Sequence, residues 1–371
     1  MGKDNKKKRS GTVLTNVFFV CIGGVAGLLI GRYFVVGALR EGFVDLLPAL
    51  FLLLVGVYLA TFLQILFHEG GHLVFGLLSG YRFSSFRIGS LMWIEQDGKM
   101  KFRRLSLAGT GGQCLMSPPP MKNGMFPYVM YNLGGVLMNL ITASVAAGVA
   151  LLCQDMRLVN TFCVMLALMG IAFALMNGIP MRGAVNNDGY NALDLGKSPQ
   201  ALRAFWLQMK INERVAAGER LRDMPDDWFL IPSDGDMKNS MVAVLGVFAC
   251  NRLMDEKRFE EADREMERLL SLDSGIVELH RRLLVNDQIY CELVGARRAE
   301  RLDALRDKAQ VKFNKSMKNF PTVLRTEYAY ALLAWHDEKK AGEIRDRFEK
   351  MAKRYPHPQE VDAERELMEN F

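Results

Sequence analysis

The pattern His-Glu-x-x-His occurs once in the sequence, at His68, Glu69 and His72. Residues four apart lie on the same face of a helix, so both imidazoles can bind a single metal ion. This spacing is typical of zinc sites in which the histidines bind the ion and the glutamate acts on water. Only five histidines occur in the chain, and two of them belong to this motif. We therefore predict a Zn²⁺ site with His68 and His72 as ligands and Glu69 as the catalytic base.

The zinc motif lies at the end of a long apolar run, not on an ordinary amphipathic helix. Each of four uncharged runs is long enough to cross the hydrocarbon core, about 30 Å thick, as a helix. These runs cover residues 11–31, 46–67, 123–154 and 158–181. Two histidines and a glutamate facing lipid would be costly, so the motif must face a polar cavity or a metal. The first run is longer than the hydrophobic region of a typical signal sequence and is predicted to be an anchor.

Basic residues next to these runs predict how the chain is oriented in the membrane. They are concentrated in the tail before the first run, in the loop 80–122 and at Arg182 after the fourth run. All three lie on one side if the spans alternate, and the positive-inside rule makes that side cytoplasmic. We therefore expect a multi-pass protein of the bacterial cytoplasmic membrane with cytoplasmic N- and C-termini. The net charge of +6 is a topology signal, and no nucleic acid partner is expected.

A third zinc ligand is predicted after the fourth run. Gly178 and Pro180 end this helix, and Asp188-Gly189 then reads as a turn that directs a carboxylate back towards the motif. Asp-Gly alone is a common turn, but the predicted topology puts it on the same side of the membrane as the motif. Asp188 would complete a His-His-carboxylate site with one position open for water.

Two asparagines in the later runs are candidate substrate contacts. Asn139, in the third run, either bonds a substrate backbone near the metal or makes a hydrogen bond between helices. Asn177 precedes Pro180 near the predicted third ligand and is the second candidate.

These motifs together resemble the site-2 protease family of intramembrane zinc metalloproteases. The resemblance rests on His68 to His72, on Gly135 to Asn139, on Asn177-x-x-Pro180 and on Asp188-Gly189, and it covers about residues 45–190. It implies that His68, His72 and Asp188 bind Zn²⁺ and that Glu69 is the base. The implied activity is hydrolysis of peptide bonds in membrane proteins or peptides near the cytoplasmic face, as in regulated intramembrane proteolysis.

A non-catalytic alternative is a membrane scaffold with a structural metal site and a helical-repeat interaction domain. A purely structural zinc has no use for a base, so the presence of Glu69 argues against this alternative. The two hypotheses share the same metal ligands and differ in the role of Glu69.

The loop between the second and third runs carries strand signals. Residues 90–96 and 99–103 flank Asp97-Gly98, a favoured two-residue hairpin turn, and a flexible stretch is expected at 111–114. This hairpin either holds an extended peptide along its edge or is a simple connector. The six cysteines are scattered without a C-x-x-C pair, which predicts free thiols.

Beyond residue 190 the sequence becomes charged and helical in pattern. Residues 255–266 and 337–348 resemble each other, and each follows an apolar helical stretch. Paired helices of this kind suggest a tetratricopeptide-like repeat domain that contacts a cytoplasmic protein partner. We thus predict a mainly α fold of about four spans in the lipid bilayer, with a small β-hairpin loop. The predicted domains are a basic tail (1–10), a membrane-embedded metalloprotease domain (11–190) and a cytoplasmic helical domain (191–371).

Overall fold

The computed structural model describes residue 17 and residues 20–32, 46–96, 98–105, 111–181 and 186–370. Over these residues the chain is mainly helical, as predicted, and it contains one small antiparallel sheet, of which only the hairpin was predicted. It divides into two compact units, Met1–Arg82 with Pro119–Lys197, and Phe83–Pro118 with Ser198–Phe371. The strand-bearing segment therefore clusters with the C-terminal helices, whereas the sequence analysis grouped it with the spans. All six cysteines are free.

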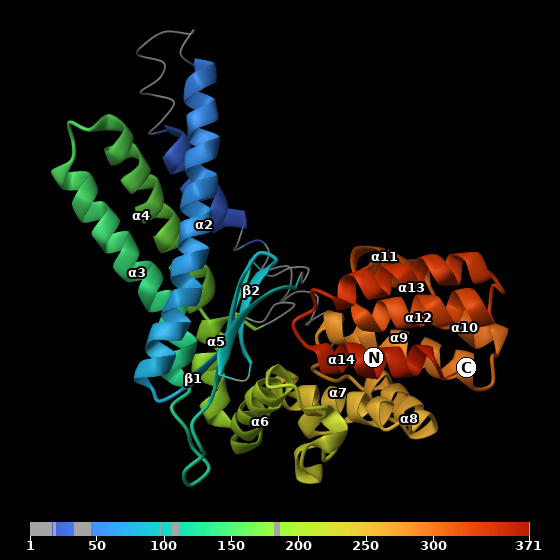
Figure 1. Ribbon diagram of the computed structural model, residues 1–371. Helices are drawn as coiled ribbons and strands as arrows, with labels where there is room; N and C mark the ends of the chain where they lie inside the picture. Colours follow the sequence, from blue (N-terminus) through green and yellow to red (C-terminus); the bar gives the residue numbers. More distant parts are fainter. Residues whose placement is uncertain are drawn as a thin grey trace. The chain divides into compact units, whose positions relative to one another are not determined.

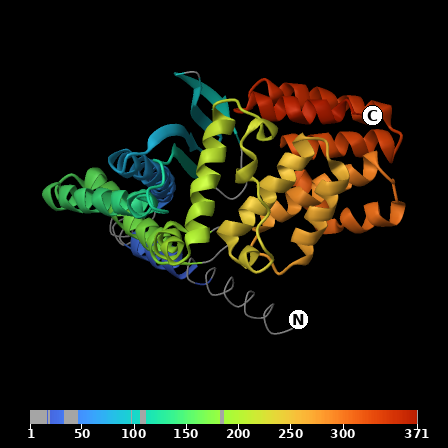
Figure 2. The same cartoon turned by 90° about the horizontal axis from the view of Figure 1, so that it is seen from below.

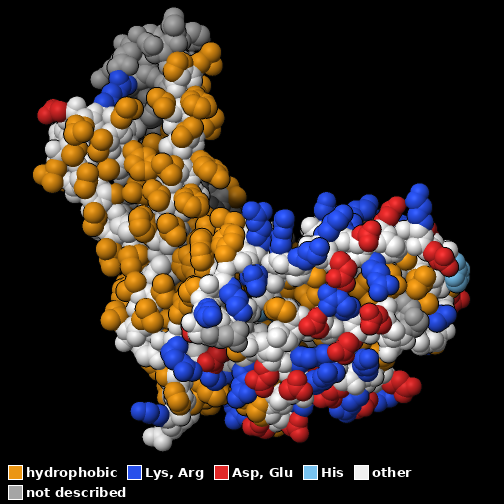
Figure 3. Space-filling view, viewed as in Figure 1, with side chains coloured by type: hydrophobic (Ala, Val, Ile, Leu, Met, Phe, Trp, Pro, Cys, Tyr) orange, Lys and Arg blue, Asp and Glu red, His pale blue; other side chains and the backbone are white. Residues whose placement is uncertain are grey.

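The first unit is built on long apolar helices. Among the described residues, three helices are long and apolar enough to cross a membrane: α2 (Leu46–Leu78), α3 (Val129–Leu152) and α4 (Arg157–Gly178) (Figure 1). They correspond to the second, third and fourth predicted runs. Their hydrophobic side chains cover the surface of this unit in Figure 3, which indicates membrane association. A shorter apolar helix, Val20–Arg32, falls at the first predicted run, most of whose earlier residues lie outside the described ones.

Glycines allow α2 and α3 to pack backbone against backbone. A Cβ atom on Gly71 would lie 2.2 Å from the carbonyl oxygen of Gly134, and one on Gly134 would lie 2.6 Å from that of Gly71. Only residues without a side chain permit this approach. The contact brings α3 against the turn of α2 that carries the two motif histidines.

The second unit contains a four-stranded sheet in the order β3-β2-β1-β4. Its strands are β1 (Arg82–Ile88), β2 (Leu91–Gln96), β3 (Lys99–Arg104) and β4 (Gly112–Ser117). The predicted hairpin is confirmed as β2 and β3, although Asp97 of its turn lies outside the described residues. The predicted flexible stretch at 111–114 is wrong, because residues 112–117 form β4.

Alternate side chains of β2 attach the sheet to the C-terminal helices. Met92 and Ile94 are buried and pack with Ala216, at the end of the first of these helices. Gln96 follows them on the same face, and its Nε2 donates to the carbonyl oxygens of Ala216 and Pro356. The period of two along the strand therefore separates a buried face from an exposed one.

The rest of the second unit is helical. Its helices are α6 (Pro199–Ala216), α7 (Ser240–Asp255), α8 (Phe259–Ser271), α9 (Glu278–Val294), α10 (Ala299–Leu305), α11 (Lys308–Ser316), α12 (Pro321–Leu333), α13 (Glu338–Ala352) and α14 (Pro358–Met368). They pack side by side in Figures 1 and 2, and the predicted similar segments fall in the pairs α7–α8 and α12–α13. Helix α9 is central, since Leu284, Ile289 and Tyr290 are fully buried. Charged side chains of both signs cover this unit in Figure 3.

Substituting Gly71 by alanine should destabilise the protein, whereas the same change at its neighbour Gly70 should not. Gly71→Ala places a methyl group against the Gly134 backbone, and such overpacking costs about 1–3 kcal/mol. Gly70 has no atom within 4 Å of its Cβ position, so Gly70→Ala should be neutral or slightly stabilising. Thermal unfolding of both variants in detergent measures the difference. Equal melting temperatures would contradict the close packing of α2 and α3.

The stability of the second unit should depend on pH through His280, in α9. Burial lowers the pKa of His280 below its ordinary value of 6.5, so the unfolded chain binds a proton more readily. The contribution of His280 is therefore present above about pH 6.5 and is lost as the pH falls below it. The urea midpoint of α9 amide protection, compared between wild type and His280→Gln, measures this loss. A difference between the two proteins that stays constant from pH 8 to pH 5 would contradict it.

Candidate metal centre

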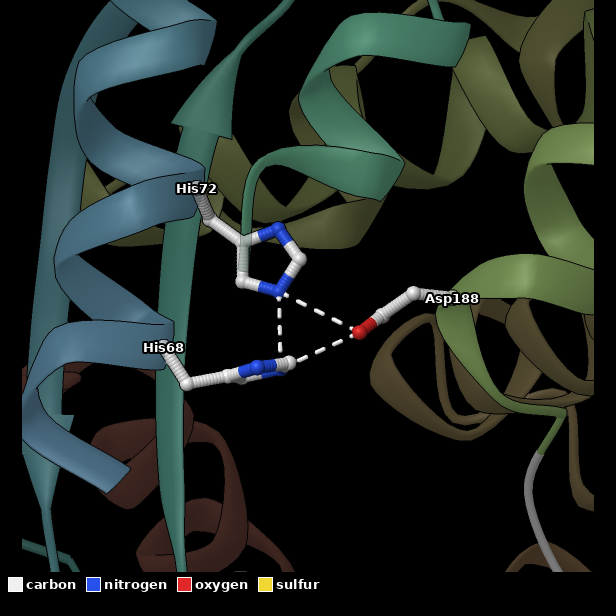
Figure 4. A group of neighbouring side chains, drawn as sticks. All are labelled: His68, His72 and Asp188. Atoms are coloured by element: carbon white, nitrogen blue, oxygen red, sulfur yellow. Dashed lines mark hydrogen bonds and ion pairs between the residues drawn. The ribbon is translucent and has the colours of Figure 1, made fainter. Parts of the chain in front are cut away.

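Three ligand atoms from two segments far apart in the sequence meet at one point. The Nε2 atoms of His68 and His72 are 3.2 Å apart, and Oδ2 of Asp188 lies 3.0 Å from the first and 3.5 Å from the second (Figure 4). Both histidines are buried, in the last part of α2. The structure therefore brings together the three residues that the sequence analysis selected as metal ligands, and this cluster could hold a metal ion.

The other nitrogen of each imidazole is already bonded. His72 Nδ1 lies 2.8 Å from the carbonyl oxygen of Tyr131, which can only accept, so this nitrogen carries the proton. His68 Nδ1 lies 2.8 Å from Oδ1 of Asn139, whose Nδ2 donates to both the backbone oxygen and Oε1 of Gln64. The amide oxygen of Asn139 therefore faces His68 and accepts its proton. If the imidazoles are neutral, each Nε2 atom is unprotonated, and its lone pair is directed at Asp188.

Three electron-pair donors at these separations repel one another unless a cation lies among them. Oδ2 of Asp188 is buried and accepts no well-directed hydrogen bond from the described residues, although both imidazoles are close. Zinc bonds of about 2.0–2.1 Å in a tetrahedron place neighbouring ligand atoms about 3.3 Å apart. The observed separations of 3.0, 3.2 and 3.5 Å match the edges of such a tetrahedron. The spacing of the three ligand atoms thus fits a tetrahedral metal ion held through three protein ligands.

Asp188 is positioned by a short helix rather than by the predicted turn. It is the first residue of α5 (Asp188–Asp194), and Asn187 caps this helix by accepting a hydrogen bond from the Tyr190 N–H. The Asn187 side chain also donates to the carbonyl oxygens of Met176 and Ile179, which ties α5 to the end of α4.

Gly189 brings α5 close to the same end of α4. A Cβ atom on Gly189 would lie 2.0 Å from the carbonyl oxygen of Gly178. Gly189 therefore serves close packing and not the predicted turn. The carboxylate reaches the histidines because the first residues of α5 lie beside the last residue of α4.

The remaining predicted site residues have distinct places. Glu69 is buried beside His68 on α2 and interacts electrostatically with His72, but it is not one of the three ligands. Asn139 makes the hydrogen bond between helices that was the alternative to substrate contact. Asn177 donates to the carbonyl oxygen of Phe173 within its own helix. Contact of either asparagine with a substrate stays a prediction.

Two supporting residues were not found from the sequence. Gln64 is fully buried one turn before His68 and bonds both Asn139 and the carbonyl oxygen of Leu166 on α4. The sequence did carry a signal for Gln64: it is a single glutamine in an apolar run, four residues before His68 and so on the same helix face. Tyr131 bonds His72 through its backbone oxygen, and the residue type at a position does not indicate such a contact. The Tyr131 ring stacks on the Tyr81 ring, with centroids 4.8 Å apart.

Removing the amide that holds His68 should weaken metal binding. Asn139→Leu deletes the acceptor for His68 Nδ1, and loss of such a partner typically lowers metal affinity about 10–100-fold. Asn177→Leu is the matched control, because among the described residues that amide donates to the carbonyl oxygen of Phe173 in its own helix. Competition with a chromogenic zinc chelator measures both affinities. Equal affinities would show that Asn139 does not orient the ligand.

A comparison of the chain with family models, curated proteins and solved structures found no match. The interpretation of this centre therefore depends on the residues of the chain and their geometry. The arrangement consists of two imidazoles and one carboxylate, with a buried glutamate next to them on the apolar helix α2.

Proposed function

We propose that the protein is an intramembrane zinc metalloprotease that hydrolyses peptide bonds of membrane-associated substrates. In this proposal the N- and C-termini are cytoplasmic and cleavage takes place near that face, as in regulated intramembrane proteolysis. The resemblance of the motifs to the site-2 protease family supports it. The observation that carries it is the convergence of His68, His72 and Asp188 beside Glu69.

The number of ligands favours a catalytic site over a structural one. Structural zinc sites are normally closed by four protein ligands, whereas catalytic sites keep one position open. Among the described residues, the cluster offers three ligand atoms. The buried glutamate next to it supplies a general base that a scaffold would not need. Both features favour the protease over the scaffold with a structural metal.

The residues of the centre divide the chemistry between them. His68, His72 and Asp188 would hold a zinc ion, and this ion would supply Lewis acidity to water and to the scissile carbonyl. Glu69 takes a proton from the attacking water and passes it to the departing amine. Asn139 and Tyr131 hold the imidazoles in the tautomer that leaves both Nε2 atoms free for the ion.

The apolar helices support a substrate that is itself in the membrane. Helices α2, α3 and α4 form the frame around the centre, so a substrate would reach it from the bilayer. Peptide bonds within a helix are shielded by their own hydrogen bonds, so the substrate must unwind locally before hydrolysis. The charged helices of the second unit offer a surface for a cytoplasmic protein partner.

Replacing the proposed base should separate activity from metal binding. Glu69→Gln keeps the three ligands and should retain zinc, while cleavage of a single-span substrate should fall at least about a hundredfold. Asp188→Ala should lose both zinc and activity. Glu338→Gln, an exposed change in α13, is the control and should behave as wild type. Zinc is measured by elemental analysis of detergent-purified protein and cleavage by gel shift.

Each contrary result of this experiment identifies a different error. Cleavage by Glu69→Gln at the wild-type rate would show that Glu69 is not the base. Zinc retention with activity in Asp188→Ala would place the third ligand elsewhere. A wild-type protein that binds zinc but cleaves nothing, with Glu69→Gln indistinguishable from it, would favour the scaffold.

A further inference from the structure

A buried glutamine joins the three long apolar helices next to the metal centre. Gln64 lies on α2, one turn before His68, and is 0% exposed. Its side chain bonds residues of α3 and of α4, although α4 carries none of the three metal ligands. A polar side chain in an apolar span is costly, so residues of this kind are typically functional. The role of Gln64 follows from the direction in which its amide points.

A backbone carbonyl sets the direction of this amide. Gln64 Nε2 lies 2.9 Å from the carbonyl oxygen of Leu166 on α4, and a carbonyl oxygen can only accept. The nitrogen must therefore face α4. The oxygen, Oε1, then faces α3, where it accepts from Asn139 Nδ2 at 2.7 Å and from Thr142 Oγ1 at 3.3 Å. An inverted amide would place two acceptors face to face at Leu166 and two donors face to face at Asn139.

Asn139 passes this direction on to His68. Its Nδ2 donates to Oε1 of Gln64 and, at 3.0 Å, to the backbone oxygen of the same residue. The oxygen of the Asn139 amide is thereby left for His68 Nδ1, 2.8 Å away, which must donate to it. A metal ion binds a neutral imidazole, and with Nδ1 protonated the binding atom is Nε2. The Leu166 carbonyl thus acts on the metal centre through two side-chain amides.

A glycine on α4 allows this contact between the helices. A Cβ atom on Gly170 would lie 2.7 Å from Gln64 Nε2 and 2.9 Å from the backbone oxygen of Asn139. Any side chain at this position would therefore separate α4 from the two amides. The close approach of α4 and the hydrogen bonds of Gln64 depend on each other.

We propose that Gln64 is a positioning residue of the metal centre, which holds the Asn139 amide in the orientation that makes His68 present Nε2 to the ion. Because the orientation of Gln64 depends on the Leu166 carbonyl, α4 supports metal binding without supplying a ligand. The inference rests on metal binding at this centre, which the proposed function also requires, and not on peptide hydrolysis.

A double-mutant cycle tests whether Gln64 acts through Asn139. Gln64→Leu should weaken Zn²⁺ binding by about fivefold, less than the roughly 10–100-fold cost of losing a direct partner of a ligand. The effect is partial because the backbone oxygen of residue 64 still accepts from Asn139. In the Asn139→Leu background, the same change should alter the affinity by less than about twofold, because the group that Gln64 positions is gone. Competition with a chromogenic chelator measures all four proteins in detergent.

Matched variants separate this effect from a loss of helix packing. Asn160 on α4 donates to the carbonyl oxygen of Ala150 on α3 at 2.6 Å, so Asn160→Leu also removes a hydrogen bond between helices. It should lower the melting temperature without changing the Zn²⁺ affinity, whereas Gln64→Leu should change both. Gly170→Ala tests the same contact if Gln64→Leu fails to fold, and it should weaken Zn²⁺ binding by about threefold. Gly148→Ala is its control, since that Cβ position has no atom within 4 Å.

Several results would overturn the proposal. Equal losses of affinity from Gln64→Leu in both backgrounds would mean that it acts through general packing. An equal loss in Asn160→Leu would mean the same, and wild-type affinity in both Gln64→Leu and Gly170→Ala would exclude any role. A wild-type protein that binds no Zn²⁺ would overturn this proposal and the proposed function together. A protein that follows the expected cycle but cleaves no substrate would support this proposal while the protease fails.

Discussion

Two imidazole nitrogens and one carboxylate oxygen lie 3.0–3.5 Å apart, a separation at which they repel one another without a shared cation. Helix packing and hydrogen bonds around the centre hold these three atoms in place. The Gly71–Gly134 contact presses α3 against α2, which lets Asn139 and Tyr131 reach the outer nitrogens of the histidines. Gly189 allows α5 to approach the end of α4. Each close approach is made at a glycine, so the metal centre depends on the absence of side chains as much as on the ligands.

Much of the centre could be predicted from the sequence because metal chemistry restricts both residue type and spacing. His68, Glu69 and His72 are four residues apart or closer, so helical periodicity alone places them. Asp188 is 116 positions after His72 and was found only by adding membrane topology to the helix-breaking signals. Gln64 and Tyr131 were missed because they support the ligands indirectly, one of them through a backbone atom.

The long hydrophobic helices could be predicted from the sequence. Strands and contacts that depend on residues far away in the sequence could not. The runs at α2, α3 and α4 follow from length and composition. Strand β4 was missed because it follows a glycine-rich stretch and owes its place to pairing with β1, not to its own pattern. Likewise, the local sequence does not show that β2 packs on α6. Met92 and Ile94 are ordinary strand residues, and only the structure shows that they pack with Ala216.

The discontinuity of the second unit has a consequence for biosynthesis. Gln96 of β2 bonds Pro356, which is 260 residues later in the chain. At a synthesis rate of roughly 5–20 residues per second, the ribosome needs about 13–52 s to make the second of these partners after the first. Helices α3 and α4 are synthesised in that interval, while the inner face of the sheet still lacks α6 and the segment before α14. The nascent sheet must therefore be protected from aggregation until nearly the whole chain has been made.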